Sequence, residues 1–355
     1  MPLGRGQLSG LRADLESRKG RRLDEMRVPR LKLADGGHSH CTELTLSSSI
    51  RPDWSCWGDR SQMNLDILRS CDLCGSDRIM VLDAGNNICK CGSCGYVFDN
   101  PRPTAEEVAI FYSKPGKYDP WVREEEARDS LWMRRLRKME KTKKPGSLLD
   151  IGTGAGQFLH HARSHYSPVC GSEVSQSGAE LAKKKYGLCV RQGDVATLDF
   201  PEAPFDNITL FHVLEHVPSP KVLIRRCAEL LKPGGRLVVA VPNDLLYLRA
   251  KVKILLKGLG VRRYRHLGEL GLARITLDGS MQEIHVSHFT AGVLRRLLEN
   301  SGFSILEDSI DPYYAATGIA KLMQDLEHAV YRVLLFAGQI RLYPAIWMVA
   351  RKESV

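Results

Sequence analysis

Short apolar runs alternate with longer amphipathic segments between residues 147 and 242. An apolar run of about four to eight residues predicts a buried strand, whereas apolar positions spaced three and four apart predict a helix. The runs that predict strands are "SLLDIG", "PVCGSEVS", "CVRQGDV", "FDNITLF" and "RLVVAVPN", and most are joined by helix-like segments. This alternation predicts right-handed crossovers and a doubly wound, mostly parallel sheet of the α/β class.

The segments that precede this region have a different character. Residues 1–62 show no sustained periodicity and are rich in Arg, Gly, Ser and Asp, which predicts a disordered extension. Recognisable organisation begins only near Met63, so translation from Met63 is an equally open interpretation. "TAEEVAIFY" (104–112) and "DPWVREEEARDSLWMRRLRKMEKTKK" (119–144) predict helices within a linker that spans residues 104–146.

The charge of the chain is concentrated in two places. The net charge is +10, of which residues 1–62 contribute +3 (11 Lys/Arg against 8 Asp/Glu) and residues 249–274 contribute +7 (eight Lys/Arg against one Glu). The remainder is near neutral, so a generally nucleic-acid-binding surface is not indicated. No apolar run approaches the ~20 residues that span a bilayer, and the N-terminus lacks a signal-peptide core. We therefore expect a cytoplasmic protein.

Four cysteines have the spacing of a metal site. Cys71 and Cys74 form one C-x-x-C-G turn, and Cys91 and Cys94 form a second after 16 intervening residues. Two such turns place four sulfur atoms around one ion, which predicts a zinc ribbon over residues 63–103. The competing interpretation is a pair of reduced thiol turns without metal. Cys89 is a spare cysteine, because it does not fit the two-residue gap.

A glycine-rich turn follows the first predicted strand. "LLDIGTGAGQF" carries Asp150 and then Gly152, Gly154 and Gly156. A dinucleotide fingerprint, G-x-G-x-x-G, requires a third glycine where this chain has Gln157, so a bound diphosphate is disfavoured. The acidic side chain of Asp150 instead suits a ligand with a positively charged group.

Acidic residues also end the next two predicted strands. Glu173 lies 21 residues after Gly152, and Asp194 ends the third strand. Ligands of doubly wound sheets bind beyond the carboxyl ends of the strands, where these acids gather. Glu173 is placed to hydrogen-bond the ribose hydroxyls of an adenosine. Asp194 is placed to accept from the adenine amine, and the N–H of Val195 to donate to a ring nitrogen.

With these motifs the sequence resembles the class I S-adenosylmethionine-dependent methyltransferases. The matching stretches lie within about 63–355 and are "LLDIGTGAGQF", "GSEVS", "QGDV", "FDNITLFHVLEHVPSP", "LLKPGGRLVVAVPN", "HFTAGVLRRLLENSGF" and "AIWMVARK". The resemblance is closest to a bacterial-type subgroup that has a four-cysteine zinc module and modifies sugars or other small metabolites. It implies a seven-stranded Rossmann-like sheet over residues 147–355.

The resemblance also implies the roles of individual residues. The glycines of the turn would contact the methionine portion of the cofactor, Glu173 the ribose and Asp194 the adenine. His212 would lie near the transferred methyl group. A general base is needed only if the acceptor loses a proton, and its candidates are His216, His285 and His288. Each of these histidines has an alternative structural role, and Asn243 is a candidate contact of the acceptor.

A basic insertion spans residues 244–284. Its "LLYLRAKVKILLKGLG" predicts an amphipathic helix with a basic face. Residues 245–265 either form a lid that packs on the domain or make peripheral contact with an anionic membrane. Arg262, Arg263 and Arg265 would hold a phosphate or carboxylate of an anionic acceptor, such as a nucleotide-linked or lipid-linked sugar.

Three functions remain open from the sequence. The leading one is S-adenosylmethionine-dependent methyl transfer to a small or lipid-linked acceptor, with S-adenosylmethionine and Zn²⁺ as cofactors. The second is methylation of RNA or protein, although the zinc ribbon lacks the interleaved basic and aromatic residues of a nucleic-acid-binding surface. The third is a non-catalytic interaction protein, against which the complete set of glycines and strand-end acids argues.

Overall fold

The structure is a computed structural model, and it describes residues 64–114, 116–142, 144–265, 267–277 and 280–354. The predictions about residues 1–62 and about a start at Met63 lie outside these residues.

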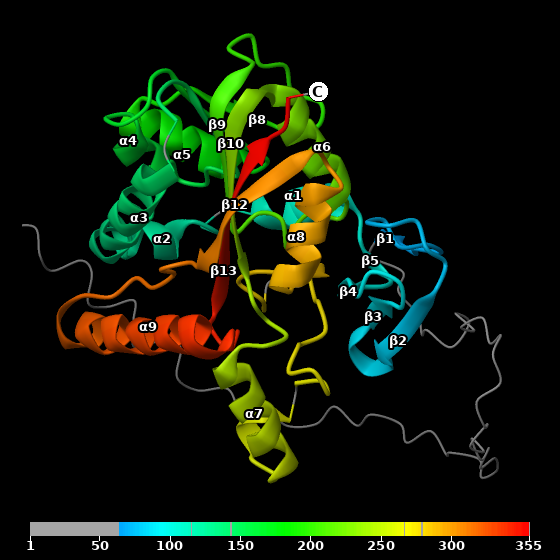
Figure 1. The fold of residues 1–355 in the computed structure, drawn as a ribbon. Coiled ribbons are helices and arrows are strands. Elements are labelled where there is room, and N and C mark those ends of the chain that lie inside the picture. The colour runs from blue at the N-terminus through cyan, green and yellow to red at the C-terminus, as the bar shows by residue number, and fades with distance from the viewer. Residues whose placement is uncertain (1–63, 115, 143, 266, 278–279, 355) are drawn as a thin grey trace, which may run out of the picture. The chain divides into compact units, whose positions relative to one another are not determined.

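A seven-stranded sheet forms the centre of the described chain (Figure 1). Its strand order is β12-β13-β10-β9-β6-β7-β8, in which β6 to β10 run parallel and β13 runs antiparallel to both of its neighbours. The strands are β6 (Leu148–Ile151), β7 (Val169–Glu173), β8 (Val190–Gln192), β9 (Phe205–Phe211), β10 (Leu231–Pro242), β12 (Phe303–Ile310) and β13 (Ala345–Lys352). This topology confirms the predicted fold class. The chain reverses its direction of winding beside β6, which is where doubly wound sheets bind ligands.

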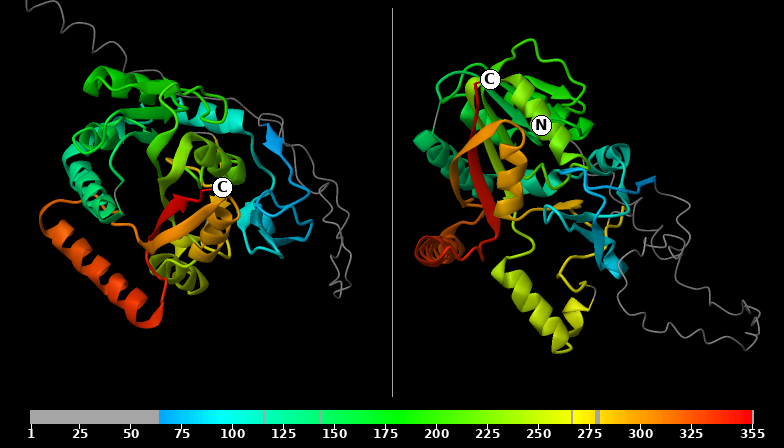
Figure 2. Two further views of the ribbon diagram at one scale, coloured as in Figure 1. Left: turned by 45° about the horizontal axis from the view of Figure 1, so that its top comes forward. Right: turned by 45° about the vertical axis from the view of Figure 1, so that its right-hand side comes forward.

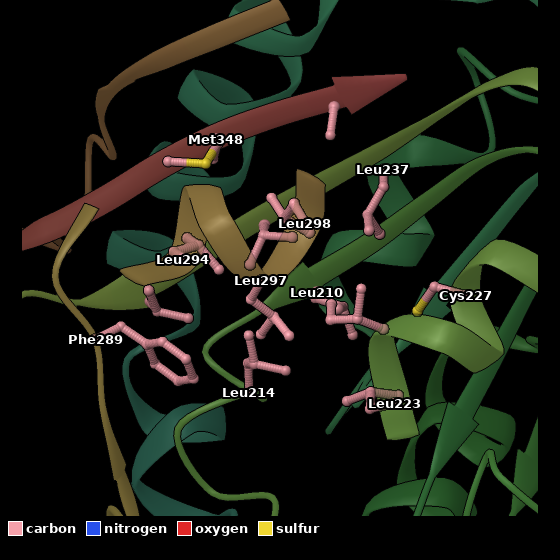
Figure 3. Close-up of a cluster of buried hydrophobic side chains, with 14 of the residues drawn as sticks. Leu210, Leu214, Leu223, Cys227, Leu237, Phe289, Leu294, Leu297, Leu298 and Met348 are labelled. Atoms are coloured by element: carbon pink, nitrogen blue, oxygen red, sulfur yellow. The ribbon is translucent and has the colours of Figure 1, made fainter. Parts of the chain in front are cut away.

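Helices cover both faces of this sheet because its central strands are apolar on both sides. One face is covered by α3 (Glu125–Met139), α4 (Gln157–Ala162) and α5 (Gln176–Tyr186), and the other by α6 (Pro220–Leu230) and α8 (Ala291–Glu299). In β10, Val239 packs toward α6 and α8, whereas Val238 packs toward α3 to α5. Figure 3 shows the first of these cores, in which leucines of α8 meet Leu210, Leu214 and Leu223.

The small sheet of the cysteine-rich segment includes a strand that comes from much later in the chain. It contributes β2 (Ile79–Asp83), β3 (Ile88–Cys91) and β4 (Val97–Asp99), and β11 (Ser287–His288) pairs antiparallel with β4. Two further short strands, β1 (Leu65–Asp66) and β5 (Arg102–Pro103), form a separate pair. The buried Tyr96 hydroxyl lies 2.6 Å from Ser287 Oγ. Cys71, Tyr96 and Phe98 belong to the same buried cluster as α6 and α8, so this segment and the sheet share one core.

The remaining helices differ in part from the sequence-based expectation. The helix expected over residues 119–144 is divided at Glu124 into α2 (Asp119–Arg123) and α3, and α1 (Ala105–Tyr112) precedes it. The basic insertion forms α7 (Leu248–Gly258), as expected. The long helix α9 (Gly318–Gly338) was not expected from the sequence. Among the described residues, no helix is both long and apolar enough to cross a membrane.

Candidate functional site

A cavity of about 600 Å³ opens at the carboxyl ends of β6, β7, β8 and β9. Helices α1, α2 and α3 contribute part of its wall, so the segment expected to be a linker helps to form the site. The predicted site residues that line the cavity are Gly152, Glu173, Asp194, Val195, His212 and His216. Their convergence from four separate strand ends makes this cavity the candidate functional site.

The glycine turn after β6 requires glycine for both conformation and space. Gly152, Gly154 and Gly156 have φ values of +71°, +55° and +82°, which side chains rarely adopt. A Cβ atom on Gly152 would lie 2.4 Å from Val213 Cγ2, and one on Gly154 would lie 2.9 Å from Trp121 Cζ3. Gly156 instead packs against α5, away from the cavity. The turn therefore brings bare backbone to the cavity at Gly152.

Asp150 lies behind this turn and does not line the cavity. Its side chain is buried, and it accepts a hydrogen bond of 2.6 Å from Thr209 Oγ1. Burial raises the pKa of Asp150 to about 6. The expected contact with a positively charged ligand group stays a prediction. In this structure the carboxyl group bonds to the neighbouring strand through Thr209.

The raised pKa of Asp150 predicts a specific pH dependence of stability. Because the folded state binds this proton more tightly than the unfolded state, the stabilisation is complete below about pH 4 and is lost as the pH rises through about 6. Relative to wild type, Asp150→Asn should therefore gain about 2–3 kcal/mol of unfolding free energy between pH 4 and pH 7. Urea unfolding at both pH values measures this. Parallel pH dependence in the two proteins would contradict it.

Glu173 ends β7 and is held by three donors. Its carboxylate accepts the N–H of Gly154 at 2.7 Å, the N–H of Ser175 at 2.9 Å and the Tyr118 hydroxyl at 3.2 Å. Burial raises its pKa, and these hydrogen bonds partly offset that rise. Oε1 already accepts two of these donors, whereas Oε2 accepts one and retains room for a further donor such as a ribose hydroxyl.

An aromatic pair that sequence reasoning missed lies over the turn and Glu173. Tyr118 and Trp121 pack edge to face with ring centroids 5.3 Å apart, and both line the cavity. The guanidinium of Arg128 stacks on Trp121 at 4.1 Å, and its buried Nε has no hydrogen-bond partner. The one signal in the sequence is the aromatic pair in "YDPW", within a segment that is otherwise strongly polar.

Asp194 and Val195 follow β8 and line the same cavity. Asp194 Oδ1 accepts the N–H of Ala196 at 2.9 Å, which fixes the turn. Val195 is almost fully buried. Both residues lie where an adenine contact requires them, and the contact itself stays a prediction.

His212 connects the cavity to a buried ion pair. Its ring stacks on Tyr313 with centroids 4.0 Å apart, and its Nε2 lies 3.3 Å from Asp311 Oδ2. Burial lowers the pKa of His212, but the bond to Asp311 and the nearby carboxylate of Glu215 outweigh burial and raise it. Asp311 also pairs with Arg135, and both side chains of that pair are completely buried. No pattern in the sequence indicates this pair, because its members are separated by 176 residues.

The other three histidines have different surroundings. His216 Nδ1 lies 2.6 Å from the carbonyl oxygen of Ile284, and burial lowers its pKa. His285 lies beside it, with ring centroids 5.1 Å apart, and its Nδ1 is 2.9 Å from Asp244 Oδ2. Burial lowers the pKa of His285, but the bond to Asp244 outweighs it and leaves that pKa well above its usual value.

His288 and Asn243 are engaged away from the cavity. His288 lies in β11, with Nε2 3.2 Å from Asp99 Oδ1 and Nδ1 3.4 Å from Asp244 Oδ2. Asn243 donates through Nδ2 to two backbone carbonyls at 2.9 Å and is 1% exposed. A catalytic role for His288 and an acceptor contact for Asn243 stay predictions, and both residues stabilise the fold in this structure.

The four predicted metal-ligating cysteines are brought together. Their sulfur atoms all lie within 4.8 Å of one another, with Cys71 to Cys94 and Cys74 to Cys91 both at 3.6 Å. The N–H groups of Ser93 and Cys94 point at Cys91 Sγ, at 3.4 and 3.5 Å. Cys89 is not part of this cluster.

Comparison with known proteins supplies relatives for this fold. An O-methyltransferase of ubiquinone biosynthesis from Coxiella burnetii is 34% identical over 116 residues, which is 31% of this chain and 50% of that protein. A probable S-adenosylmethionine-dependent methyltransferase from Mycolicibacterium smegmatis is 22% identical over 229 residues, 63% of this chain and 75% of that protein. The chain spans about half the length of the first of these relatives.

Among solved structures, a magnesium protoporphyrin IX methyltransferase from Synechocystis with bound S-adenosylhomocysteine matches with a TM-score of 0.43 and 16% identity, over 69% of this chain and 98% of that one. The family model described as "Methyltransferase domain" matches residues 124–308, which is more than half of the chain. The chain therefore belongs to the methyltransferase domain family.

Proposed function

We propose that this protein transfers a methyl group from S-adenosylmethionine to a hydroxyl group of a small or lipid-linked acceptor. The observation that carries the proposal is the single cavity into which Gly152, Glu173, Asp194 and His216 converge from separate strand ends. The family and the Mycolicibacterium relative support S-adenosylmethionine as the donor. The Coxiella relative, whose name is an O-methyltransferase of ubiquinone biosynthesis, supports an oxygen acceptor.

The residues present suit this cofactor. Backbone at Gly152 faces the cavity in a conformation that excludes a side chain, so the methionine portion has close access to main-chain groups. Glu173 would accept a hydrogen bond from a ribose hydroxyl, and Asp194 with the N–H of Val195 would hold the adenine. The unpartnered Nε of Arg128 suits the carboxylate of the methionine portion. When bound, the cofactor supplies a methyl group on a positively charged sulfur atom.

The protein contributes mainly alignment and exclusion of water. Methyl transfer is an in-line displacement, and fixing donor and acceptor in that geometry supplies much of the rate. Six aromatic side chains line the cavity and limit the access of water, namely Tyr112, Tyr118, Trp121, Trp132, Phe211 and Tyr313. His216 is the histidine of this wall that would position or deprotonate an acceptor hydroxyl, and His285 lies behind it with its ring centroid 5.1 Å away.

The aromatic lining favours an apolar or aromatic acceptor, and an anionic group on it would suit Lys117, which also lines the cavity. A screen with methyl-labelled S-adenosylmethionine tests this, using hydroxylated aromatics, lipid-linked quinone precursors, and nucleotide-linked and lipid-linked sugars. We expect label in one of these small-molecule classes. Label found only in RNA or protein would favour the alternative class of acceptor, and no turnover with bound cofactor would favour a non-catalytic role.

We further propose that the four-cysteine cluster binds zinc through thiolates. Four sulfur atoms at 2.3 Å from a tetrahedral ion lie about 3.8 Å apart, and the Sγ pairs Cys71–Cys94 and Cys74–Cys91 are at 3.6 Å. The donor set and its size therefore fit one Zn²⁺. The ion would stabilise the cysteine-rich segment, which shares its core with α8.

The zinc proposal predicts that Cys91→Ser loses one zinc per chain and several kcal/mol of stability. Zinc released by an organomercurial thiol reagent, together with thermal unfolding, measures both quantities. Cys189→Ser is the matched control, because Cys189 is exposed and lies outside the cluster. Wild-type protein that releases no zinc on thiol titration would refute the proposal.

A further inference from the structure

Glu215 is an unusual buried carboxylate on the loop between β9 and α6. It is 1% exposed, and neither of its carboxylate oxygens has a hydrogen-bond partner. Its Oε1 lies 3.3 Å from His212 Nδ1 and 3.8 Å from His216 Nε2. Its backbone carbonyl accepts the N–H groups of Val286 and Ser287, which fixes the loop. A buried carboxylate needs positive charge beside it, and the rings of His212 and His216 flank this one.

Two imidazoles beside Glu215 are oriented as metal ligands commonly are. His216 Nδ1 bonds to the Ile284 carbonyl, and His285 Nδ1 bonds to the Asp244 carboxylate. Both partners are acceptors, so each Nδ1 carries a proton and each Nε2 is the nitrogen that would bind an ion, which at His285 would displace a proton from it. A second hydrogen-bond partner of this kind is typical of histidines that bind metals.

These three residues form a set of donors beside the cavity, and His216 is the one that lines it. One ligand atom from each of Glu215, His216 and His285 lies within 4.8 Å of the other two. Donors at about 2.1 Å from a tetrahedral ion are about 3.4 Å apart, so a small side-chain movement closes the set around an ion. His216 lines the cavity, as does the nearby Glu283. An ion bound at His216 would therefore have its open coordination positions on the side of the cavity, where a ligand can reach them.

We propose that Glu215, His216 and His285 bind a divalent transition-metal cation. Two imidazoles and one carboxylate suit such ions, and the open positions would hold oxygen atoms of a hydroxylated acceptor. The metal site itself stands independently of methyl transfer, whereas its role toward the acceptor rests on the proposed function.

Titration of the purified full chain with Mn²⁺, followed by the loss of the free-ion electron paramagnetic resonance signal, tests this site. Mn²⁺ prefers oxygen and nitrogen donors, so the thiolate cluster competes little. We expect one Mn²⁺ per chain in wild type and roughly hundredfold weaker binding in Glu215→Gln and in His285→Gln. His161→Gln is the matched control, because His161 lies on α4, outside the proposed set, and pairs with Asp129.

Thermal unfolding without metal provides a second readout. Glu215→Gln removes a proposed ligand and the carboxylate beside His212, so the variant should unfold at a lower temperature than wild type without Mn²⁺, and Mn²⁺ should raise the unfolding temperature of wild type more than that of the variant. Wild type that binds no Mn²⁺, or variants that bind as wild type does, would overturn the site. Calorimetry of S-adenosylmethionine on the same samples separates the two proposals. Protein that binds the cofactor but no Mn²⁺ would contradict only the metal site. Protein that binds Mn²⁺ but no cofactor would contradict only the proposed methyl transfer.

A separate observation concerns α9, whose apolar side is exposed. Tyr331 is its one buried residue. Seven large apolar side chains of α9 are exposed, at three- and four-residue spacings for the most part, and Phe336 is 91% exposed. They are Ile319, Leu322, Met323, Leu326, Val330, Val333 and Phe336. An uncovered apolar face of this length marks an interaction surface.

Helix α7 lies next to α9 and adds positive charge (Figures 1 and 2). Arg249 Nε lies 3.2 Å from Glu327 Oε1, and the rings of Tyr247 and Tyr331 are 6.5 Å apart. The apolar side chains of Leu248, Val252, Leu255 and Leu259 are exposed. Residues 248–265 contain seven Lys/Arg and no Asp or Glu.

We propose that α7 and α9 dock on an anionic lipid bilayer. The apolar side chains would enter the interface while the flanking lysines and arginines contact lipid phosphates. Charge decides between this occupant and a second copy of the chain, because a symmetric contact would bring two strongly basic segments together.

Flotation with vesicles of phosphatidylcholine alone, and of phosphatidylcholine mixed equally with phosphatidylglycerol, tests the docking surface. We expect salt-sensitive flotation with the anionic vesicles only, and its loss in Phe336→Glu and in Lys253→Glu. Ile110→Glu and Lys183→Glu are matched controls on α1 and α5. No flotation, or a wild-type dimer by light scattering that Phe336→Glu dissociates, would overturn the proposal.

Discussion

Replacement of Glu173 by alanine is expected to weaken S-adenosylmethionine binding by about a hundredfold or more. The ribose would lose a charge-assisted hydrogen bond, worth about 1.5–3 kcal/mol. The variant also leaves the buried N–H groups of Gly154 and Ser175 without their acceptor. The glycine turn and the start of α5 would therefore lose their alignment together with the ribose contact. Calorimetric titration of the cofactor measures the effect.

Two further variants separate the ribose contact from the support of the turn. Glu173→Gln keeps one oxygen acceptor and should weaken binding less than alanine does. Glu180→Ala, at an exposed position on α5, should bind as wild type does. Wild-type affinity in folded Glu173→Ala protein would show that the cofactor does not use this carboxylate.

Replacement of Asp311 by alanine is expected to cost about 3–5 kcal/mol of unfolding free energy. Asp311 and Arg135 are both fully buried, with Arg135 Nε 3.0 Å from Asp311 Oδ1. Removal of the carboxylate leaves a buried guanidinium without a counter-charge, and Nη1 of Arg135 already has no hydrogen-bond partner. His212 loses its partner as well, so cofactor or acceptor binding at the cavity should weaken. Urea unfolding measures the stability change.

A double variant distinguishes loss of the charge pair from loss of packing. Arg135→Met with Asp311→Leu removes both charges and should recover most of the stability. A buried ion pair seldom stabilises a protein more than apolar side chains of similar volume do. Asp325→Ala breaks an exposed pair with Lys321 on α9 and should cost less than about 1 kcal/mol. Equal costs for Asp311→Ala and Asp325→Ala would contradict the role assigned to the buried pair.

The parts of the site that the sequence predicted are those encoded by local pattern. The parallel sheet follows from apolar runs, and the positions of Gly152, Glu173 and Asp194 at the cavity follow from their places at strand ends. The four cysteines also come together as their spacing predicts.

The parts that escaped prediction depend on distant segments or on burial. Asp311 pairs with Arg135 across 176 residues, and no periodicity reports such a contact. Tyr118 and Trp121 belong to a polar segment whose role as a cavity wall depends on how α2 packs. The burial of Asp150 against Thr209 depends on the neighbouring strand β9, and no local pattern around Asp150 in the sequence reports it.

Calorimetric titration of S-adenosylmethionine and S-adenosylhomocysteine into the purified full chain, with NAD as the control ligand, tests the central claim most directly. The account predicts binding of the first two in the micromolar range and none of NAD, because the turn at Gly152 and the carboxylate of Glu173 suit an adenosine that lacks a diphosphate. Folded protein that binds neither S-adenosyl compound would contradict it.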